Sequence, residues 1–450
     1  MSADLVAEFI TAACVPRDES HASGTLDRAD AILKEHPEVA RANIHTAAIL
    51  GDDAGVRVFI GRDTSTATAK GGPHEWDALT HLCFSRYLRL DPRRSDGFVR
   101  AAKLLLDAGA SANTGWFEPN HQPKPEWEPA LYGAAGIAHH PELTALLLAH
   151  GANPNDNEVV YHAPESYDNR ALELLVQTGK LTDESLSLML IRKLDWHDYE
   201  GVKWLLEHGA NADRERWRGL VALHHALARD NSLEIITQLV DHGADPTRVE
   251  NGHSAVAMAA REGRSDVLAL FAERGIAVEL QGVDGLIMAC AMGDAVQVRG
   301  IAAREPRLKA DVLAMGGELL AKFAGTGNVE GVRQLLDLGV GAASLYAQGD
   351  GYWDIAKNST ALHVAAWRAQ HDVVKLLIER GAPVNDRDAK GRTPLMLAVK
   401  ACIDSYWIGR RSPASVDALL RAGASVEGVP FPSGYAEVDE LLRPGISSTL

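Results

Sequence analysis

Cysteine and aromatic residues are scarce in this chain, and long apolar runs are missing. Only 4 of its 450 residues are cysteine, and none of them follows a C-x-x-C spacing, which argues against a disulfide-stapled secreted module. The absence of about 18 uninterrupted apolar residues excludes a membrane-spanning helix. The opening MSADLVAEFITAACVPRDES lacks the basic start of a signal peptide. We therefore expect a reduced, cytoplasmic protein.

The chain has fewer basic than acidic residues. The chain has 45 Lys and Arg against 61 Asp and Glu, a formal net charge of −16, which argues against a general binder of nucleic acids or anionic membranes. The net charge leaves a local basic patch open. Hydrophobic residues make up 46 % of the chain, which excludes a disordered protein. A compact domain usually stops growing at about 250–300 residues. The length therefore predicts either several domains or a repeat array.

Internal repeats decide between these two organisations. Residues 393–398 read Thr-Pro-Leu-Met-Leu-Ala, and residues 360–365 read Thr-Ala-Leu-His-Val-Ala. The two leucines, Leu362 and Leu395, are 33 residues apart, as are Leu223 and Val256. This pattern resembles the ankyrin repeat, whose signature T-P-L-H-x-A recurs about every 33 residues. The resemblance implies an all-α solenoid of stacked helix-turn-helix units with a curved concave face.

A second motif, V-x-x-L-L-x-x-G-A, marks the end of each unit. Its glycine fits the position after a helix, where a left-handed backbone favours glycine, and it recurs at 109, 151, 209, 243, 381 and 423, with weaker versions at 179, 275 and 339. We expect about twelve units, with first helices near Phe9, Ile44, Leu79, Leu131, Tyr161, Leu186, Leu223, Val256, Leu286, Leu320, Leu362 and Leu395. They form a single array over 1–450, with recognisable repeats at 43–427, a degenerate unit at 1–42 and a C-terminal cap at 428–450.

Three segments depart from the repeat pattern. They cover residues 87–98, 114–129 and 404–413, and each contains aromatic residues. Long loops inside a repeat array are often functional. A functional and a purely structural role are both open for these segments.

The histidines and cysteines favour structural roles. His45, His224 and His363 occupy the position of the histidine in the T-P-L-H-x-A signature. The resemblance implies that this histidine forms a hydrogen bond to the backbone. Cys83 and Cys290 align with small alanines, so we expect buried thiols. No H-E-x-x-H or clustered Cys/His spacing is present. We therefore expect no metal and no cofactor.

One central run does not fit the repeat. Residues 192–200 read Arg-Lys-Leu-Asp-Trp-His-Asp-Tyr-Glu, and an Asp beside a His can supply an acid–base group. An enzyme or small-ligand pocket would draw on Asp195, His197, Asp198, Tyr199, Tyr161 and His162. The competing interpretation is that Asp195 or Asp198 caps the following helix and His197 stands where the consensus has glycine. No recognised catalytic motif is present.

Tryptophan and arginine mark a second candidate site. Eight of the nine tryptophans fall outside outer-helix core positions, and tryptophan is enriched in binding hot spots. Trp367 is expected at the exposed position that faces the concave surface. The alternative is that each tryptophan packs under a neighbouring unit. The candidate ligand-binding residues are Trp217, Arg218, Arg229, Trp367, Arg368, Arg392, Tyr406 and Trp407.

The resemblance implies binding rather than chemistry, so the leading hypothesis is a non-catalytic recognition scaffold. It would bind a protein or peptide on its concave Trp/Arg-rich face, or an anionic or aromatic small ligand. We expect no nucleic acid or membrane partner, and a monomer. The alternative is the enzyme or small-ligand pocket of the central repeats.

Overall fold

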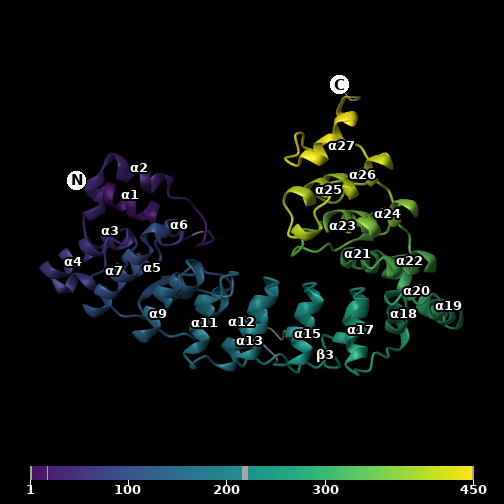
Figure 1. Ribbon diagram of the computed structural model, residues 1–450, viewed down its shortest axis with the longest axis horizontal. Helices are drawn as coiled ribbons and strands as arrows, with labels where there is room; N and C mark the ends of the chain where they lie inside the picture. Colours follow the sequence, from purple (N-terminus) through teal and green to yellow (C-terminus); the bar gives the residue numbers. More distant parts are fainter. Residues whose placement is uncertain (1–2, 18, 215–220, 448–450) are drawn as a thin grey trace. The chain divides into compact units, whose positions relative to one another are not determined.

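The computed structural model describes residues 3–17, 19–214 and 221–447. Contacts within the chain group it into two compact units, residues 1–244 and 245–450. Each is an all-α stack of helix-turn-helix pairs with only short strands (Figure 1). The single-array organisation remains a prediction. No helix among the described residues is long and apolar enough to cross a membrane.

In the first unit the inner helices α3, α5, α8, α10, α12 and α14 pack one on the next. The elements are α1 (Ala3–Ala13), α2 (Asp27–Glu35), η1 (Pro37–Arg41), α3 (Ile44–Ile49), α4 (Asp53–Arg62), η2 (Thr64–Ala67), α5 (Ala78–Cys83), α6 (Arg86–Leu90), η3 (Pro92–Arg94), α7 (Ser95–Asp107), β1 (Gly115–Glu118), β2 (Glu126–Pro129), α8 (Ala130–Tyr132), η4 (Gly133–Ile137), α9 (Pro141–Ala149), α10 (Asn157–His162), α11 (Arg170–Gln177), α12 (Asp183–Asp195), α13 (Tyr199–Glu207), α14 (Ala222–Ala228) and α15 (Leu233–Asp241).

In the second unit the helix pairs follow the same order, with one addition. The elements are β3 (Val249–Glu250), β4 (His253–Ser254), α16 (Ala255–Arg261), α17 (Ser265–Glu273), α18 (Gly282–Ala291), α19 (Ala295–Arg304), α20 (Pro306–Ala314), α21 (Gly316–Thr326), α22 (Val329–Leu338), β5 (Leu345–Tyr346), β6 (Ser359–Thr360), α23 (Ala361–Trp367), α24 (His371–Glu379), α25 (Pro394–Ile403), η6 (Ile408–Arg410), α26 (Ala414–Arg421) and α27 (Ala436–Ser447). Helix α20, which the repeat pattern did not predict, packs against α18, α19 and α21.

Sequence positions and helices agree closely. Each of the twelve predicted start residues lies inside a helix, although Tyr161 lies near the end of α10 and not at its start. The predicted left-handed glycines are confirmed: Gly209, for example, has φ +100°. His363 makes the expected backbone contacts, with its Nε2 3.0 Å from the Asp386 carbonyl oxygen. All four cysteines are buried and unpaired to one another.

The three atypical segments have different structures. Residues 87–98 form α6, η3 and the start of α7, and Tyr87 is buried with its hydroxyl donating to Asp30 Oδ1 at 2.6 Å. Residues 114–129 contain the antiparallel hairpin β1–β2, which pairs Trp116 with Glu128. Residues 404–413 carry η6 and place Trp407 in a buried position. The first segment is therefore part of the packing, whereas the other two contribute to the sites described next.

Candidate functional site

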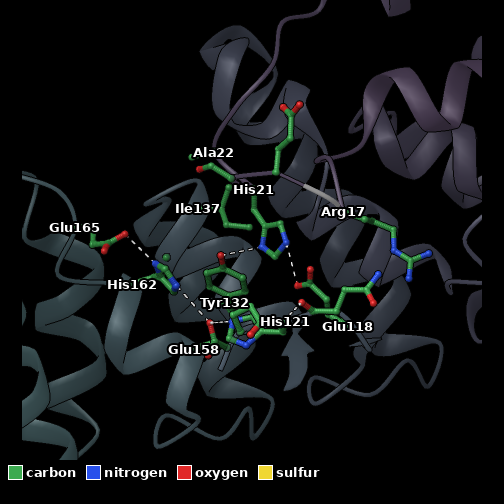
Figure 2. A pocket seen from close by; sticks show the side chains of 15 residues that line it. Arg17, His21, Ala22, Glu118, His121, Tyr132, Ile137, Glu158, His162 and Glu165 are labelled. Carbon is green, nitrogen blue, oxygen red and sulfur yellow. Dashed lines mark hydrogen bonds and ion pairs between the residues drawn. The ribbon is translucent and has the colours of Figure 1, made fainter. Parts of the chain in front are cut away.

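A pocket of about 380 Å³ lies in the first unit beside the β1–β2 hairpin. It is lined by residues from four separate parts of the chain (Figure 2): the segment after α1, the hairpin, the α8–η4 region and α10. Five acidic and imidazole side chains next to it form what we call the glutamate–histidine cluster: His21, Glu118, His121, Glu128 and Glu158.

The two strands of the hairpin approach each other closely where Gly115 of β1 faces β2. A Cβ added at Gly115 would lie 2.2 Å from the Glu128 carbonyl oxygen, so only glycine fits there. Trp116 is 3 % exposed and faces Phe84 and Trp76 at ring distances of 5.9 and 5.1 Å. The hairpin is thus anchored on the helical stack, which fixes the glutamates that it carries.

His21 and Tyr132 form one side of the pocket. His21 Nδ1 lies 3.0 Å from the Tyr132 hydroxyl, and His21 Nε2 lies 3.3 Å from Glu118 Oε2. Figure 2 shows the imidazole between these two partners. Burial and the nearby charge of His162 lower the pKa of His21 to about 4. The ring is therefore neutral at pH 7, with one nitrogen available to accept a proton or a metal ion.

Glu158 and His162 form the other side. Glu158 Oε2 lies 3.3 Å from His162 Nε2 and 3.6 Å from His121 Nε2, and His162 Nδ1 lies 2.8 Å from Glu165 Oε2. Although burial lowers it, the two glutamates raise the pKa of His162 to about 9. A protonated His162 therefore holds both carboxylates in place (Figure 2).

Glu128 has the most unusual environment in this group. Its side chain is fully buried, and neither oxygen accepts from a nitrogen or hydroxyl donor; its polar neighbour is the carboxyl of Glu118. Burial, followed by the charges of Glu158 and Glu118, raises the pKa of Glu128 to about 9. A buried carboxyl without a donor is costly in its ionised form. The site therefore favours either a proton or a cation at Glu128.

Five of the six residues of the predicted central pocket do not line this pocket. Three of the six are linked to one another: Arg192 contacts Tyr161 and Asp195, and Glu165 joins Arg192 to His162. Only His162 lines the pocket; the Arg192 guanidinium stacks 4.1 Å from the ring of Tyr161. Asp198 accepts a hydrogen bond from Gly201 N at the start of α13, where Tyr199 is the first helical residue. His197 has φ +51°, in place of the consensus glycine. The competing interpretation, a cap at Asp198 and His197 at the glycine position, is confirmed.

Asp195 is the centre of an ion-pair network. Its carboxylate accepts from Arg192 at 2.5 Å and from both His225 and Arg229 at 2.8 Å. Although burial raises it, the hydrogen bonds of His225 and Arg229 and the charge of Arg192 lower the pKa of Asp195 to about 2. The predicted ligand-binding residue Arg229 thus binds a carboxylate of the same chain.

This network predicts a pH dependence. Because its folded pKa is lowered, Asp195 stabilises the fold above about pH 3.8, and the contribution is lost as the pH falls through about 2. We expect Asp195→Asn to lower the unfolding free energy by roughly 2 kcal/mol at pH 7, with a smaller difference from the parent below pH 3. Urea unfolding of both proteins across this range measures the difference. The exposed control Asp107→Asn should differ little at any pH, and a pH-independent deficit for Asp195→Asn would contradict the prediction.

The second unit holds a buried aromatic and cationic cluster. Arg368 is 5 % exposed, with its guanidinium 4.7 Å from the ring of Trp353 and 5.0 Å from that of Trp407. Trp367 Nε1 donates to the Trp353 carbonyl oxygen at 2.6 Å. The expectation that Trp367 is exposed is wrong, since it is 8 % exposed. Residues 404–413 supply Trp407, whose ring meets that of Trp367 at 5.6 Å.

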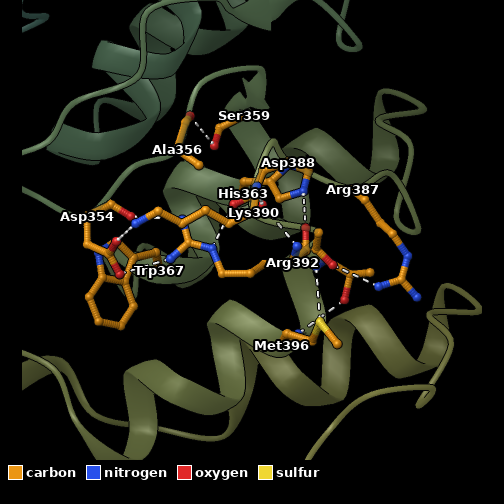
Figure 3. Close-up of polar contacts among 12 residues, drawn as sticks. Asp354, Ala356, Ser359, His363, Trp367, Arg387, Asp388, Lys390, Arg392 and Met396 are labelled. Carbon is orange, nitrogen blue, oxygen red and sulfur yellow. Dashed lines mark hydrogen bonds and ion pairs between the residues drawn. The ribbon is translucent and has the colours of Figure 1, made fainter.

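Three cations converge on one carboxylate beside this cluster. Lys390, Arg392 and Lys400 lie 2.5, 2.9 and 3.0 Å from Asp354, as Figure 3 shows for the first two. Arg392 also binds Asp388 at 2.8 Å. Although burial raises it, the hydrogen bonds of Lys390 and Lys400 lower the pKa of Asp354 to about 2. These ion pairs hold residues 388–392 against Asp354. Three cationic side chains share two carboxylates, which leaves a local excess of positive charge.

Large apolar side chains are exposed around the buried cluster. Tyr406 is 48 % exposed, Ile408 70 % and Tyr352 38 %. The ring of Tyr352 lies 4.7 Å from Trp353, and the ring of Tyr406 lies 5.8 Å from it. We call the exposed residues Tyr352, Tyr406 and Ile408 the aromatic platform. Trp217 and Arg218, two predicted ligand-binding residues, lie outside the described residues.

The repeat family is decided by comparison with known sequences. The model of the family described as "Ankyrin repeats (3 copies)" matches residues 188–282, 286–388 and 318–427, which together make up just over half of the chain. The chain belongs to the ankyrin-repeat family. Its all-α helix pairs and left-handed glycines agree with that membership.

Curated relatives of this ankyrin-repeat protein match over limited stretches. Serine/threonine-protein kinase 12 of Arabidopsis thaliana is 40 % identical over 19 % of this chain and 16 % of its own length. Protein glp-1 of Caenorhabditis elegans is 30 % identical over 28 % of this chain and 11 % of its own. An ankyrin repeat protein of Rickettsia bellii (strain RML369-C) is 32 % identical over 24 % of this chain and 48 % of its own. The chain thus spans less than half the length of each.

Sequence reasoning missed most of the pocket in this ankyrin-repeat protein. Of its acidic and imidazole groups it named only His162. The available signal was the 114–129 segment, which carries Glu118, His121 and Glu128 within eleven residues. His21 and Glu158 lie far from that segment in sequence and carry no local signature.

Proposed function

We propose that this protein is a recognition module that binds a partner protein through the aromatic platform of its second unit. Ankyrin repeats are generally protein–protein interaction modules. The observation that carries the proposal is that Tyr352, Tyr406 and Ile408 are exposed, and that both tyrosine rings lie against the buried ring of Trp353. Rigid aromatic side chains bind with a low entropic cost, and tyrosine is enriched in hot spots.

The charge around the platform supports a particular class of partner. Lys390 and Lys400 have side chains that are 58 % and 43 % exposed. They share Asp354 with Arg392, which also pairs with Asp388, so three cations face two carboxylates. A surface with apolar rings next to surplus positive charge complements a segment with an apolar residue beside acidic ones. We therefore propose a partner segment of that composition.

The buried residues have a supporting role in this proposal. Trp353 and Trp407 lie against the platform tyrosines, and Trp367 and Arg368 pack on these two tryptophans. Arg392 ties the adjacent turn to Asp354. We further propose that the protein is monomeric and cytoplasmic, in keeping with its four unpaired cysteines. Light scattering on the purified protein tests the monomer.

The test replaces the two most prominent platform residues. We expect the double variant Tyr406→Ser/Ile408→Ser to bind a captured partner about 30-fold more weakly or worse, since hot spots contribute about 2 kcal/mol or more. The partner is first isolated from native extract with the parent protein, identified, purified and titrated against each variant.

A matched control makes the same kind of substitution, an exposed apolar residue to serine, outside the platform. Val296 on α19 is 74 % exposed and in the same unit, so Val296→Ser should bind as the parent does. Equal affinity of the platform variant and the parent would contradict the proposal.

A further inference from the structure

We propose that the glutamate–histidine cluster of the first unit binds a divalent transition-metal ion, with Glu128 as the central ligand. The cluster contains two sets of three groups whose ligand atoms lie within 4.8 Å of one another: His21, Glu118 and Glu128, and His121, Glu128 and Glu158. Glu128 is the member that both sets share. This site is independent of the platform in the second unit.

The spacing of the ligand atoms suits a metal ion. His21 Nε2 lies 3.3 Å from Glu118 Oε2, and His121 Nε2 lies 3.6 Å from Glu158 Oε2. Bonds of about 2.1 Å in tetrahedral geometry place neighbouring ligand atoms about 3.4 Å apart. Within each pair, the imidazole nitrogen and the carboxylate oxygen therefore already have about the separation of two ligands on one ion.

The state of Glu128 is an independent observation that points to a ligand. Its side chain is fully buried and neither oxygen accepts from a nitrogen or hydroxyl donor; its polar neighbour is the carboxyl of Glu118. Three carboxylates meet here with Glu158, which is 3 % exposed. Placing several carboxylates together in a buried site is costly unless a positive charge lies between them. A divalent cation supplies that charge in place of the proton that Glu128 holds when no ion is bound.

The surrounding groups have the arrangement of an outer coordination shell. A His21 that donates from Nδ1 to the Tyr132 oxygen, 3.0 Å away, presents an unprotonated Nε2 toward Glu118. Metal-bound histidines are commonly oriented by such a second hydrogen bond. His162 contacts Glu158 at 3.3 Å and is itself held by Glu165 at 2.8 Å, so it positions Glu158 without belonging to either set of three.

The types of ligand atom limit which metal ions can bind here. Each set of three offers one imidazole and two carboxylates, and so nitrogen and oxygen but no sulfur, which excludes the thiolate sites that select Cu(I). Calcium takes six to eight oxygen ligands and magnesium prefers carboxylates and water. Mixed imidazole and carboxylate ligands suit Zn²⁺, Mn²⁺ and Fe²⁺. We therefore infer an ion of this class.

The experiment uses the full chain without a histidine tag. The protein is stripped with a chelator, dialysed against Zn²⁺ or Mn²⁺, desalted and analysed for bound metal by mass spectrometry. We expect at least one equivalent of bound metal for the parent. Glu128→Gln, which keeps the shape of the side chain, should weaken binding by roughly 100-fold or more, as measured by competition with a chromogenic chelator.

Three further measurements separate binding from folding. Glu184→Gln, an exposed change of the same kind on α12, should retain the metal. His121→Gln alters a ligand at the rim of the pocket and should also lose affinity while its circular dichroism matches that of the parent. Co²⁺ should give visible ligand-field bands in the parent and not in Glu128→Gln. An unloaded parent, or equal affinity of parent and Glu128→Gln, would overturn the proposal.

Discussion

Replacing Asp198 by asparagine is expected to lower the unfolding free energy of the first unit by about 3–5 kcal/mol, the usual cost of breaking a buried ion pair. The side chain of Lys193 is fully buried, with its Nζ 2.7 Å from Asp198 Oδ2 and 2.5 Å from the Ser166 carbonyl oxygen. The variant leaves the Lys193 ammonium in the core with neutral groups as hydrogen-bond partners and only the charge of Asp168 nearby. Urea unfolding followed by circular dichroism measures the loss.

A double variant tests the reason for this loss. Buried ion pairs can often be replaced by apolar side chains at little cost, so Lys193→Met/Asp198→Asn should regain most of the stability that Asp198→Asn loses. The N-cap contact from Asp198 to Gly201 N is 3.1 Å long, and asparagine can keep it. A loss below about 1 kcal/mol for the single variant would mean that the buried pair does not determine stability here.

The second large effect concerns Trp367. We expect Trp367→Ala to destabilise the second unit by about 3–5 kcal/mol, as for other buried large-to-alanine changes. The indole is 8 % exposed, contacts the ring of Trp407, and donates to the Trp353 carbonyl oxygen. Its removal leaves a cavity and an acceptor without its donor. Hydrogen exchange of α23 and α25, together with urea unfolding, measures the effect.

The control for this prediction lies on the same surface. Tyr406 is 48 % exposed and contacts the same cluster, so Tyr406→Ala should cost less than about 1 kcal/mol. If Trp367→Ala were as mild as Tyr406→Ala, the packing role of Trp367 would be wrong and a surface role would return.

The helices could be predicted because each repeat carries its own signals. The apolar start residue and the final glycine are 19 or 20 residues apart in the units that begin at Leu223, Val256, Leu320 and Leu362, so those units can be recognised from local sequence alone. Helix α20 could not be found in this way, because it is an addition between two repeats. Tyr161 was misplaced within α10 for a related reason, since that unit departs most from the consensus.

The exposure of Trp367 could not be predicted from its repeat position. The position faces outward in an isolated repeat, but residues 404–413 fold against it and bring Trp407 within 5.6 Å. Insertions have no repeat register, so the sequence does not indicate which surface they cover. The same limit applies to the glutamate–histidine cluster, in which His21 and Glu158 are 137 positions apart. Spacing rules for metal sites detect neighbours in sequence, and these ligands are neighbours only after the hairpin has packed.

Hydrogen–deuterium exchange of the purified complex with its partner tests the proposed recognition surface most directly. We expect protection on binding in residues 350–355 and 404–411, which contain Tyr352, Tyr406 and Ile408, and little change around Val296. Protection confined to other parts of the chain, with both platform segments unchanged, would contradict it.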